Sequence, residues 1–302
     1  MNKNKNISKV RQMARFFTIL PMMMLVLTLN VYAQSTQKVT YANKKQIDEL
    51  FATKLMVVLD ANPFTEYNMV IKDFMSKYWT LTPYEIITHA QFDKTRNDPK
   101  ITFMFLSKVQ LERDKKEVHY MYLNIAKGVK SRNLTAMPEL LSIPLSYTGA
   151  DEESYAEKLP LMLLFAQIHL NNIKAARNPK PFFNLKSYSD DSRFLKDMTL
   201  LVVEADLAEE VNTVEKIQKD YPGDVRIVTL EEIAKAIEEK RPNTAVLHQV
   251  SPGENDNRGR SYCQVYGVVD GKLYYYNHQA VTQRRPPGML ARDFRLITGK
   301  WF

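Results

Sequence analysis

Cysteine is nearly absent from this sequence. Cys263 is the only one among 302 residues, so no intramolecular disulfide can form and the fold depends on its hydrophobic core. The histidines are also few, and no two of them are spaced to bind a metal on one helix face. They are His89, His119, His169, His248 and His278. We therefore expect no disulfide, no metal and no cofactor.

Glycine is lacking where a nucleotide-binding loop would need it. The loops that follow the two predicted first strands read DANPFTE and EADLAEE, without glycine. A phosphate loop needs glycine so that backbone N–H groups can approach the anion. The carboxylates in these loops, Asp60 and Glu204 among them, suit helix capping and would repel a phosphate. Nucleotide binding is therefore disfavoured.

Hydrophobic runs long enough to span a membrane are lacking as well. The apolar run FFTILPMMMLVLTL at 16–29 has 14 residues, fewer than the roughly 20 that a spanning helix needs. Five cationic residues precede it, and the small residues Val31 and Ala33 follow it before Gln34. This order is typical of a secretory signal peptide over residues 1–33, cleaved before Gln34. A membrane anchor is the alternative, which the short run disfavours.

A strong net charge is lacking once that segment is removed. The whole chain carries +8, of which five charges belong to residues 1–33, so the remaining chain carries +3. A charge this small does not favour nucleic acid as a partner. The ending VYAQ resembles the signal peptides of secreted proteins from Gram-negative bacteria. We therefore expect an exported protein, in the periplasm or outside the cell, with no membrane span after cleavage.

One pattern that the sequence does contain occurs twice. LTPYEII at 81–87 and VTLEEIA at 228–234 each place Thr-x-x-Glu before residues with helical apolar spacing. The pattern is typical of a capping box, with Thr82 and Thr229 as N-caps and the glutamates three residues later as their partners. We therefore predict that a helix starts at each threonine.

The elements around the two boxes also repeat. Upstream we expect an amphipathic helix, an apolar strand (LMVVL or LLVV), a helix that begins near Asn62 or Asp206, and a short strand (YWTL or VRIV). Downstream we expect a helix, a strand and an aromatic strand (HYMYLNI or LYYYNHQ). We therefore interpret residues 43–149 and 190–299 as a tandem duplication. Chance similarity between two α/β segments is the alternative.

These elements predict an α/β fold with two tandem βαβαββ-type units, and they leave open one more strand at the end of each. Strands separated by helices pair in parallel through right-handed crossovers, so we expect mainly parallel sheets that end in antiparallel hairpins. Asp270-Gly271 suits a type I′ hairpin turn. The predicted domains are a signal peptide at 1–33, a first α/β unit at 34–150, a connecting helix and linker at 151–189, and a second α/β unit at 190–302.

The order of elements resembles that of the small α/β domain at the amino terminus of the Tol-system envelope protein. It is also similar to the related domains of curli-secretion and penicillin-binding-protein-activator lipoproteins. The resemblance extends over both predicted units and includes no specific motif. It implies a scaffolding or interaction role in the envelope, and it carries over no catalytic residues.

The connection between the units is predicted to be one long helix. Residues 152–177 are strongly apolar, above all in LMLLFA, and Pro160 marks either a first turn or a kink. A helix this apolar needs cover on several sides, from the first unit, from both units or from a second copy. A proline-containing linker follows at 178–191, and we expect Asp190-Asp191 to cap the next helix.

Cys263 is the candidate nucleophile that the sequence offers. With His248 or His278 within hydrogen-bond reach, its thiol would form the nucleophile–base pair of a hydrolase. The alternative is a buried apolar cysteine in the run SYCQVYGVV, which no family signature surrounds. We expect the buried cysteine, whose thiol reacts slowly because burial raises its pKa.

Tyrosines form a second candidate site. Tyr120 and Tyr122 alternate on one predicted strand, and Tyr274 and Tyr276 alternate on another. Such faces would stack against a sugar or a peptide, as in a carbohydrate-binding module. Alternating tyrosines are equally typical of an ordinary half-buried strand.

A polar loop is the third candidate. SPGENDNRGR at 251–260 has no clear counterpart in the first unit, and with Arg284-Arg285-Pro286-Pro287 it would form a recognition edge. A tolerated insertion is the alternative.

A non-enzymatic exported envelope protein is the function class that these observations favour. It would bind or scaffold a protein or glycan partner. A hydrolase that uses Cys263 and a carbohydrate-binding module that uses the tyrosine strands are the alternatives. The sequence assigns no catalytic residue, no set of binding residues and no oligomeric state.

Overall fold

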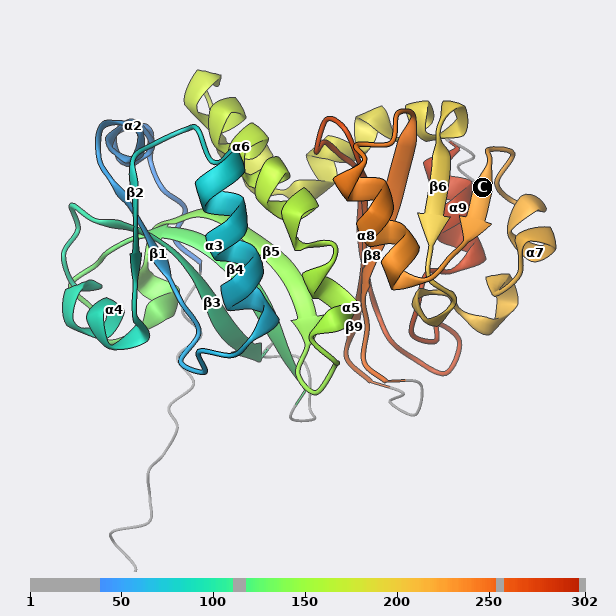
Figure 1. The fold of residues 1–302 in the computed structure, drawn as a ribbon, viewed down its shortest axis with the longest axis horizontal. Helices are drawn as coiled ribbons and strands as arrows, with labels where there is room; N and C mark the ends of the chain where they lie inside the picture. The colour runs from blue at the N-terminus through green and yellow to red at the C-terminus, as the bar shows by residue number, and fades with distance from the viewer. Residues whose placement is uncertain (1–38, 111–117, 254–257, 299–302) are drawn as a thin grey trace, which may run out of the picture. The chain divides into compact units, whose positions relative to one another are not determined.

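The computed structural model describes residues 39–110, 118–253 and 258–298 (Figure 1). The predicted signal peptide at 1–33 and the predicted turn ERDKKE at 112–117 lie outside these ranges. Among the described residues, no helix is both long and apolar enough to cross a membrane.

The first five strands form one mixed sheet. They are β1 (Leu55–Val58), β2 (Tyr84–Ile87), β3 (Thr102–Gln110), β4 (His119–Lys127) and β5 (Glu139–Tyr147). In the order β2-β1-β3-β4-β5, β1 pairs in parallel with β2 and β3, and β4 and β5 continue the sheet in antiparallel orientation. The sequence of β1, LMVV, is apolar throughout because helices cover both faces of the sheet.

The last five strands form a second sheet with the same connections. They are β6 (Thr199–Val202), β7 (Val225–Ile227), β8 (Thr244–Val250), β9 (Arg260–Gly267) and β10 (Leu273–Ala280). Their order, β7-β6-β8-β9-β10, matches that of the first sheet strand for strand. The α/β fold with two tandem units is therefore confirmed. Descent of the two units from one duplicated gene segment stays a prediction, with which the shared order agrees.

The helices of the first unit lie on both faces of its sheet. They are α2 (Lys44–Ala52), α3 (Glu66–Tyr78) and α4 (His89–Thr95). The β1–β2 and β2–β3 connections run in opposite directions, so right-handed crossovers place α3 and α4 on opposite faces. Ile71 of α3 lies in one core with Val57, and Phe92 of α4 lies in another with Val58. These two valines are neighbours on β1 and point to opposite faces.

The first predicted capping box is wrong. Tyr84–Ile87 is strand β2, and the Thr82 hydroxyl accepts a hydrogen bond from the Trp79 indole at 3.2 Å. The β-branched pair Ile86-Ile87 favours a strand beside β1. The predicted strand YWTL is also wrong, because its tyrosine is the last residue of α3 and the strand begins farther along the chain.

A capping box does occur six residues later. The Thr88 side chain accepts from the Gln91 N–H, and the Gln91 side chain accepts from the Thr88 N–H, at the start of α4. Thr229 caps α8 (Leu230–Glu238), as predicted, by accepting from the Glu232 N–H. The Glu232 carboxylate does not complete the predicted box, because it accepts a hydrogen bond from Arg241 instead. β1 pairs with β2, which ends just before Thr88, and β6 pairs in the same register with β7, which ends just before Thr229. Thr88, not Thr82, is therefore the counterpart of Thr229.

Each unit has one strand beyond the βαβαββ pattern, and this strand lies at the end of the unit. Ser107 pairs with Tyr122 on β4, and Val250 pairs with Tyr262 on β9. The counterpart of the aromatic strand HYMYLNI is therefore β9, and LYYYNHQ is the added strand β10. The loop at 251–259 joins β8 to β9 as the corresponding loop joins β3 to β4, so it is not an insertion.

The β9–β10 turn also differs from the prediction. A type I′ turn needs a positive φ at both central residues. Of Asp270 and Gly271, only Gly271 has one, at 64°. The Asp270 carboxylate accepts a hydrogen bond from the Lys272 N–H, and the Gly271 N–H donates to the Gly267 carbonyl. The turn is therefore wider than a two-residue hairpin loop.

Short 3₁₀ helices replace two α-helices predicted in and before the second unit. They are η3 (Leu185–Asp197), η4 (Glu204–Asp206) and η5 (Glu209–Val211). The helix predicted near Asp206 begins later, as α7 (Val214–Gln218), with Thr213 as its cap. Asp190 and Asp191 lie inside η3 and do not cap a helix. Ser and Asp side chains compete for backbone hydrogen bonds and so disfavour a regular α-helix in this run.

The predicted connecting helix is divided into α5 (Glu153–Ala156) and α6 (Leu159–Ala175), with Pro160 in the first turn of α6. One hydrophobic core contains side chains of α6 together with residues of both sheets, and Figure 1 shows α6 between them. Both units therefore cover this apolar helix and belong to one compact body. The remaining described helices are η1 (Leu134–Ala136), η2 (Lys180–Phe183) and α9 (Ala291–Ile297).

Candidate functional site

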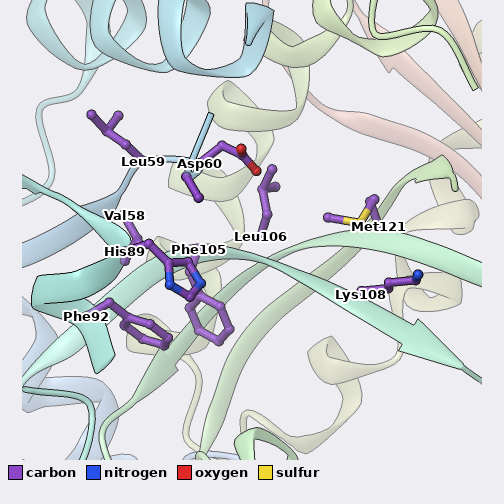
Figure 2. A pocket seen from close by; sticks show the side chains of 10 residues that line it. Val58, Leu59, Asp60, His89, Phe92, Phe105, Leu106, Lys108 and Met121 are labelled. Atoms are coloured by element: carbon purple, nitrogen blue, oxygen red, sulfur yellow. The ribbon is translucent and has the colours of Figure 1, made fainter. Parts of the chain in front are cut away.

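The first sheet has a crevice at the point where its strand order reverses. From β1 the chain crosses to β2 on one side, and from β2 it returns to β3 on the other, so the carboxyl ends of β1 and β3 flank the crevice. Ligands of open α/β sheets bind at such points. The cavity here has a volume of about 230 Å³ (Figure 2). It is lined by Val58, Leu59, Asp60, Ala61, His89, Phe92, Phe105, Leu106, Lys108 and Met121.

The floor of the crevice is apolar. Phe92 on α4 packs against Phe105 on β3, with ring centroids 5.0 Å apart, and both are buried. Val58, at the end of β1, lies in the same core. Figure 2 shows the rings of His89, Phe92 and Phe105 gathered at one end of the crevice, with Met121 near the other. The floor therefore suits an apolar group rather than a phosphate.

Polar side chains lie at the rim of the crevice. The Asp60 carboxylate is half-buried and accepts a hydrogen bond from the Asn62 N–H at 2.8 Å. His89 is the first residue of α4, and its Nδ1 lies 3.4 Å from an oxygen of Asp93. Lys108 is exposed on β3. Within the described part of the chain, no hydrogen bond or ion pair joins Asp60, His89 and Lys108, so they do not form a nucleophile–base pair.

A second cavity, of about 210 Å³, lies on the α3 side of the same strand ends. It shares Asp60, Leu106 and Met121 with the first cavity. Its other lining residues are Thr65, Tyr67, Leu145, Ser146, Tyr147, Thr148, Gly149, Ala150, Glu152 and Tyr155. The two cavities therefore adjoin along β3, one on each face of the sheet.

The second cavity is acidic. Glu152 reaches the start of α3, where its carboxylate accepts a hydrogen bond from the Glu66 N–H at 2.7 Å. Burial raises the pKa of Glu66, and the carboxylates of Glu153 and Glu152 raise it further. A carboxylate of the chain itself thus occupies the helix terminus that would attract a phosphate. The cavity therefore favours a cation over an anion.

The corresponding place in the second unit is filled by the protein itself. Lys158, which precedes α6, reaches the carboxyl end of β6 and lies 2.6 Å from the Asp206 carboxylate. Its side chain is 1% exposed. Burial raises the pKa of Asp206, and the Lys158 ammonium opposes that rise. The Lys158–Asp206 pair therefore occupies the space that stays open in the first unit.

His248 is the counterpart of Phe105 on β8. Its side chain is buried, and neither ring nitrogen has a hydrogen-bond partner of ordinary geometry among the described residues. Burial, with the nearby Lys158 ammonium, lowers its pKa to about 3. His248 is therefore neutral at physiological pH.

The structure separates Cys263 from both candidate histidines. Cys263 pairs with Gln249 across the sheet, whereas His248 pairs with Gln264 and His278 with Tyr262. Neighbouring residues of a strand point to opposite faces, so both imidazoles lie on the face opposite the thiol. Cys263 is 4% exposed, and burial raises the pKa of its thiol. The residues of the hydrolase hypothesis are thus not brought together.

The tyrosines of the carbohydrate hypothesis are largely covered. Tyr120 and Tyr122 pack against Tyr262 where the two units meet, and the Tyr122 and Tyr262 hydroxyls are 2.8 Å apart. Tyr276 packs against the same cluster, and Tyr274 is 8% exposed. Tyr120, Tyr122 and Tyr276 therefore serve the contact between the units, whereas Tyr274 packs in the core of the second unit and donates its hydroxyl to Asp270.

The two segments of the proposed recognition edge do lie side by side. The Val281 N–H donates to the Gly259 carbonyl, and Thr282 and Arg285 exchange two backbone hydrogen bonds that close an exposed turn. Residues 254–257 of the polar loop lie outside the described ranges. Nothing in the described part of this edge forms a cavity or a set of converging side chains that assigns a ligand.

The sequence did not single out Lys108, Met121 or Lys158. Asp60 was considered only as a helix cap, and Lys158 as one residue of an apolar helix. The sequence does contain a signal for the crevice. Apolar and polar residues continue to alternate through SKVQ after ITFMFL, which predicts that this strand extends well beyond the end of β1. Among the described residues, no group of three His, Cys, Asp or Glu could hold a metal ion.

The chain was compared with protein-family models, with curated proteins and with solved structures, and none of the three comparisons returned a significant match.

Proposed function

We propose that the protein is an exported, non-enzymatic protein of the cell envelope that binds a partner in the crevice of its first unit. Export rests on the order of charged, apolar and small residues in 1–33. The envelope role rests on the resemblance of the element order to domains of envelope scaffolds. Binding rests on the crevice.

The observation that carries the proposal is the contrast between two corresponding places in one fold. In the second unit the Lys158–Asp206 pair fills the strand ends. In the first unit two adjoining cavities of about 230 and 210 Å³ remain, with an apolar floor and acidic surroundings on one side. A protein has no structural need for an open crevice at one of two equivalent positions, so the open one is the candidate binding site.

A photo-crosslinking amino acid in place of Lys108, at the rim of the crevice, tests this proposal in the native host. We expect a specific crosslinked product with an envelope component. The same probe in place of Lys235, an exposed residue of α8 in the second unit, is the matched control and should give none. Identical products from both positions, or none from either, would contradict the proposal.

Export is tested by the intact mass of the protein from the native host. We expect a chain that begins at Gln34. A mature mass that still includes residues 16–29 would exclude signal cleavage.

A further inference from the structure

The strand β3 has a free edge that borders the crevice. It has nine residues, but β1 pairs only with Thr102–Met104 at its beginning. Beyond Met104, β3 is paired with β4 alone. Unpaired strand edges are templates for the addition of another strand.

The backbone groups on this edge point into the crevice. The Gly128 N–H donates to the Ile101 carbonyl, so Ile101 and every second residue after it point their backbone groups toward β4. Leu106 and Lys108 therefore point theirs away from β4. The carbonyl of Val58, where the β1 ladder would continue, accepts from the Tyr67 hydroxyl at 3.3 Å instead. In the ladders of the described residues, Leu106 and Lys108 pair only with β4, and no side chain or loop among the described residues donates to or accepts from their main chain.

The two cavities lie where the side chains of an added strand would go. The first cavity, with Phe92 and Phe105, is on the α4 side of β3, and the second, with Tyr67 and Glu152, is on the α3 side. Successive side chains of a strand point to opposite faces. An added strand would therefore place alternate side chains in an apolar cavity and in an acidic one.

We propose that the free edge of β3 binds an extended peptide by strand addition, and that this peptide alternates apolar with basic residues. The apolar residues enter the cavity over Phe105, and Lys or Arg side chains enter the cavity beside Asp60 and Glu152. Main-chain hydrogen bonds to Leu106 and Lys108 supply affinity, and the two cavities supply specificity. This inference rests on the proposed function and specifies its partner.

In the second unit, other segments of the chain lie against the side chains at the corresponding positions. Gln249 on β8 and Ser251, the residue just after β8, are the counterparts of Leu106 and Lys108, because Val250 corresponds to Ser107. The Ser251 hydroxyl accepts from the Gly288 N–H, and the Gln249 side chain donates to the Ser251 hydroxyl. The chain's own segment at 286–289 and the Lys158–Asp206 pair thus occupy what is open in the first unit. The second unit should not bind the peptide.

The first arm of the test uses charge. The mature full chain is titrated against a fluorescein-labelled heptapeptide of alternating Lys and Val, and against its Glu–Val analogue. We expect the Lys–Val peptide to bind at least tenfold more tightly. Glu152→Gln keeps a hydrogen-bond acceptor for the start of α3 and should weaken this binding at least threefold. The matched variant Glu231→Gln, at the start of α8, should leave it unchanged. Equal affinity for both peptides would overturn the assignment of a basic partner.

The second arm tests the backbone pairing. In a strand, residues that share a face also share an edge, so N-methylation of all valines and N-methylation of all lysines block opposite edges of the peptide. We expect one of these two analogues to lose at least tenfold in affinity and the other to bind as the parent does. Equal losses, or no loss in either analogue, would overturn strand addition.

The two proposals fail in different ways. If the Lys108 crosslink forms but no peptide of the set binds, strand addition by a basic peptide is wrong and the crevice remains a binding site. If no crosslink forms at Lys108 and the Lys–Val peptide also fails to bind, both proposals are wrong.

Discussion

The two units connect five strands in the same order, yet among the described residues cavities line the strand ends of the first unit, whereas the Lys158–Asp206 pair lies at those of the second. In the first unit Phe105 is part of the floor of one cavity, and the carboxylates of Asp60 and Glu152 line the adjoining one. In the second unit His248 takes the place of Phe105, and Lys158 reaches Asp206 beside it. Topology therefore supplies a place for a ligand, while side chains from outside the unit decide whether that place is open.

The crossover from the first strand to the second also differs between the units. In the first unit it is α3, with 13 residues, capped by Thr65 and contacted at its start by Glu152. In the second unit it is two 3₁₀ turns and α7, with 5 residues. The backbone of Leu207 pairs with Met289 in that region. The shorter crossover brings the chain's own segments over the strand ends, where α3 leaves room.

Breaking the Lys158–Asp206 pair should have the largest effect on stability. Lys158→Met leaves the half-buried Asp206 carboxylate without its partner, which costs about 3–5 kcal/mol. Urea unfolding of the mature chain measures the loss. Lys108→Met, at the open crevice, should change the free energy of unfolding by less than about 0.5 kcal/mol. Equal effects of the two substitutions would show that the Lys158–Asp206 pair does not stabilise the fold.

His248, unlike its counterpart Phe105, should make the free energy of unfolding depend on pH. Burial lowers the pKa of His248 to about 3. Below about pH 6.5 the histidine is therefore protonated in the unfolded chain, whereas it stays neutral in the folded chain. The contribution of His248 to the free energy of unfolding is fully present above pH 6.5 and is lost as the pH falls. The loss is on the order of 3 kcal/mol at pH 4. His248→Phe should remove this part of the acid sensitivity.

Two further histidines serve as controls for that measurement. Burial also lowers the pKa of His169, to about 4, and its ring is held between the Leu140 carbonyl and the Tyr188 hydroxyl. Acid sensitivity from His169 should therefore persist in the His248→Phe variant. His89→Phe, at an exposed position of the first unit, is the control for the His-to-Phe substitution itself. A profile that His248→Phe does not alter would contradict the assignment.

Cys263 should behave as a structural residue. Its buried thiol has a raised pKa, so we expect native protein to resist alkylation and denatured protein to react. Cys263→Ser should lower the free energy of unfolding by about 1–3 kcal/mol, because the new hydroxyl needs a hydrogen bond in an apolar place. Cys263→Ala adds no polar group and should cost less. Rapid alkylation of the native protein would contradict burial.

The smallest expected effect concerns the contact between the two units. Tyr122 and Tyr262 hold corresponding positions, and their hydroxyls form a hydrogen bond at 2.8 Å. In a double-mutant cycle of Tyr122→Phe and Tyr262→Phe, we expect a coupling energy of about 1 kcal/mol. Tyr84→Phe, on the outer strand β2, should show no coupling to Tyr262→Phe. Coupling near zero for the first pair would mean that this bond does not join the units.

Much of the architecture follows from the pattern of the sequence. The apolar runs that became β1 and β6, the helix start at Thr229 and the apolar connecting helix were all predicted from periodicity and capping residues. Two errors have local causes. Thr82 precedes a strand because Ile86 and Ile87 pair beside β1, and the true cap, Thr88, uses Gln91 instead of Glu. The tyrosine-rich strands β4 and β10 were matched with each other, although the counterpart of β4 is β9. This error shifted the alignment of the two units by one strand.

The sequence by itself determined the α/β class, the repeated order of elements and the burial of Cys263, because these depend on spacing between neighbouring residues. Only the tertiary structure decided which crevice is open. Lys158 and Asp206 are 48 residues apart, and the free edge of β3 exists because β1, far away in the chain, ends earlier than β3 does. Such contacts depend on how whole elements pack against one another, and no local pattern of side chains encodes that packing.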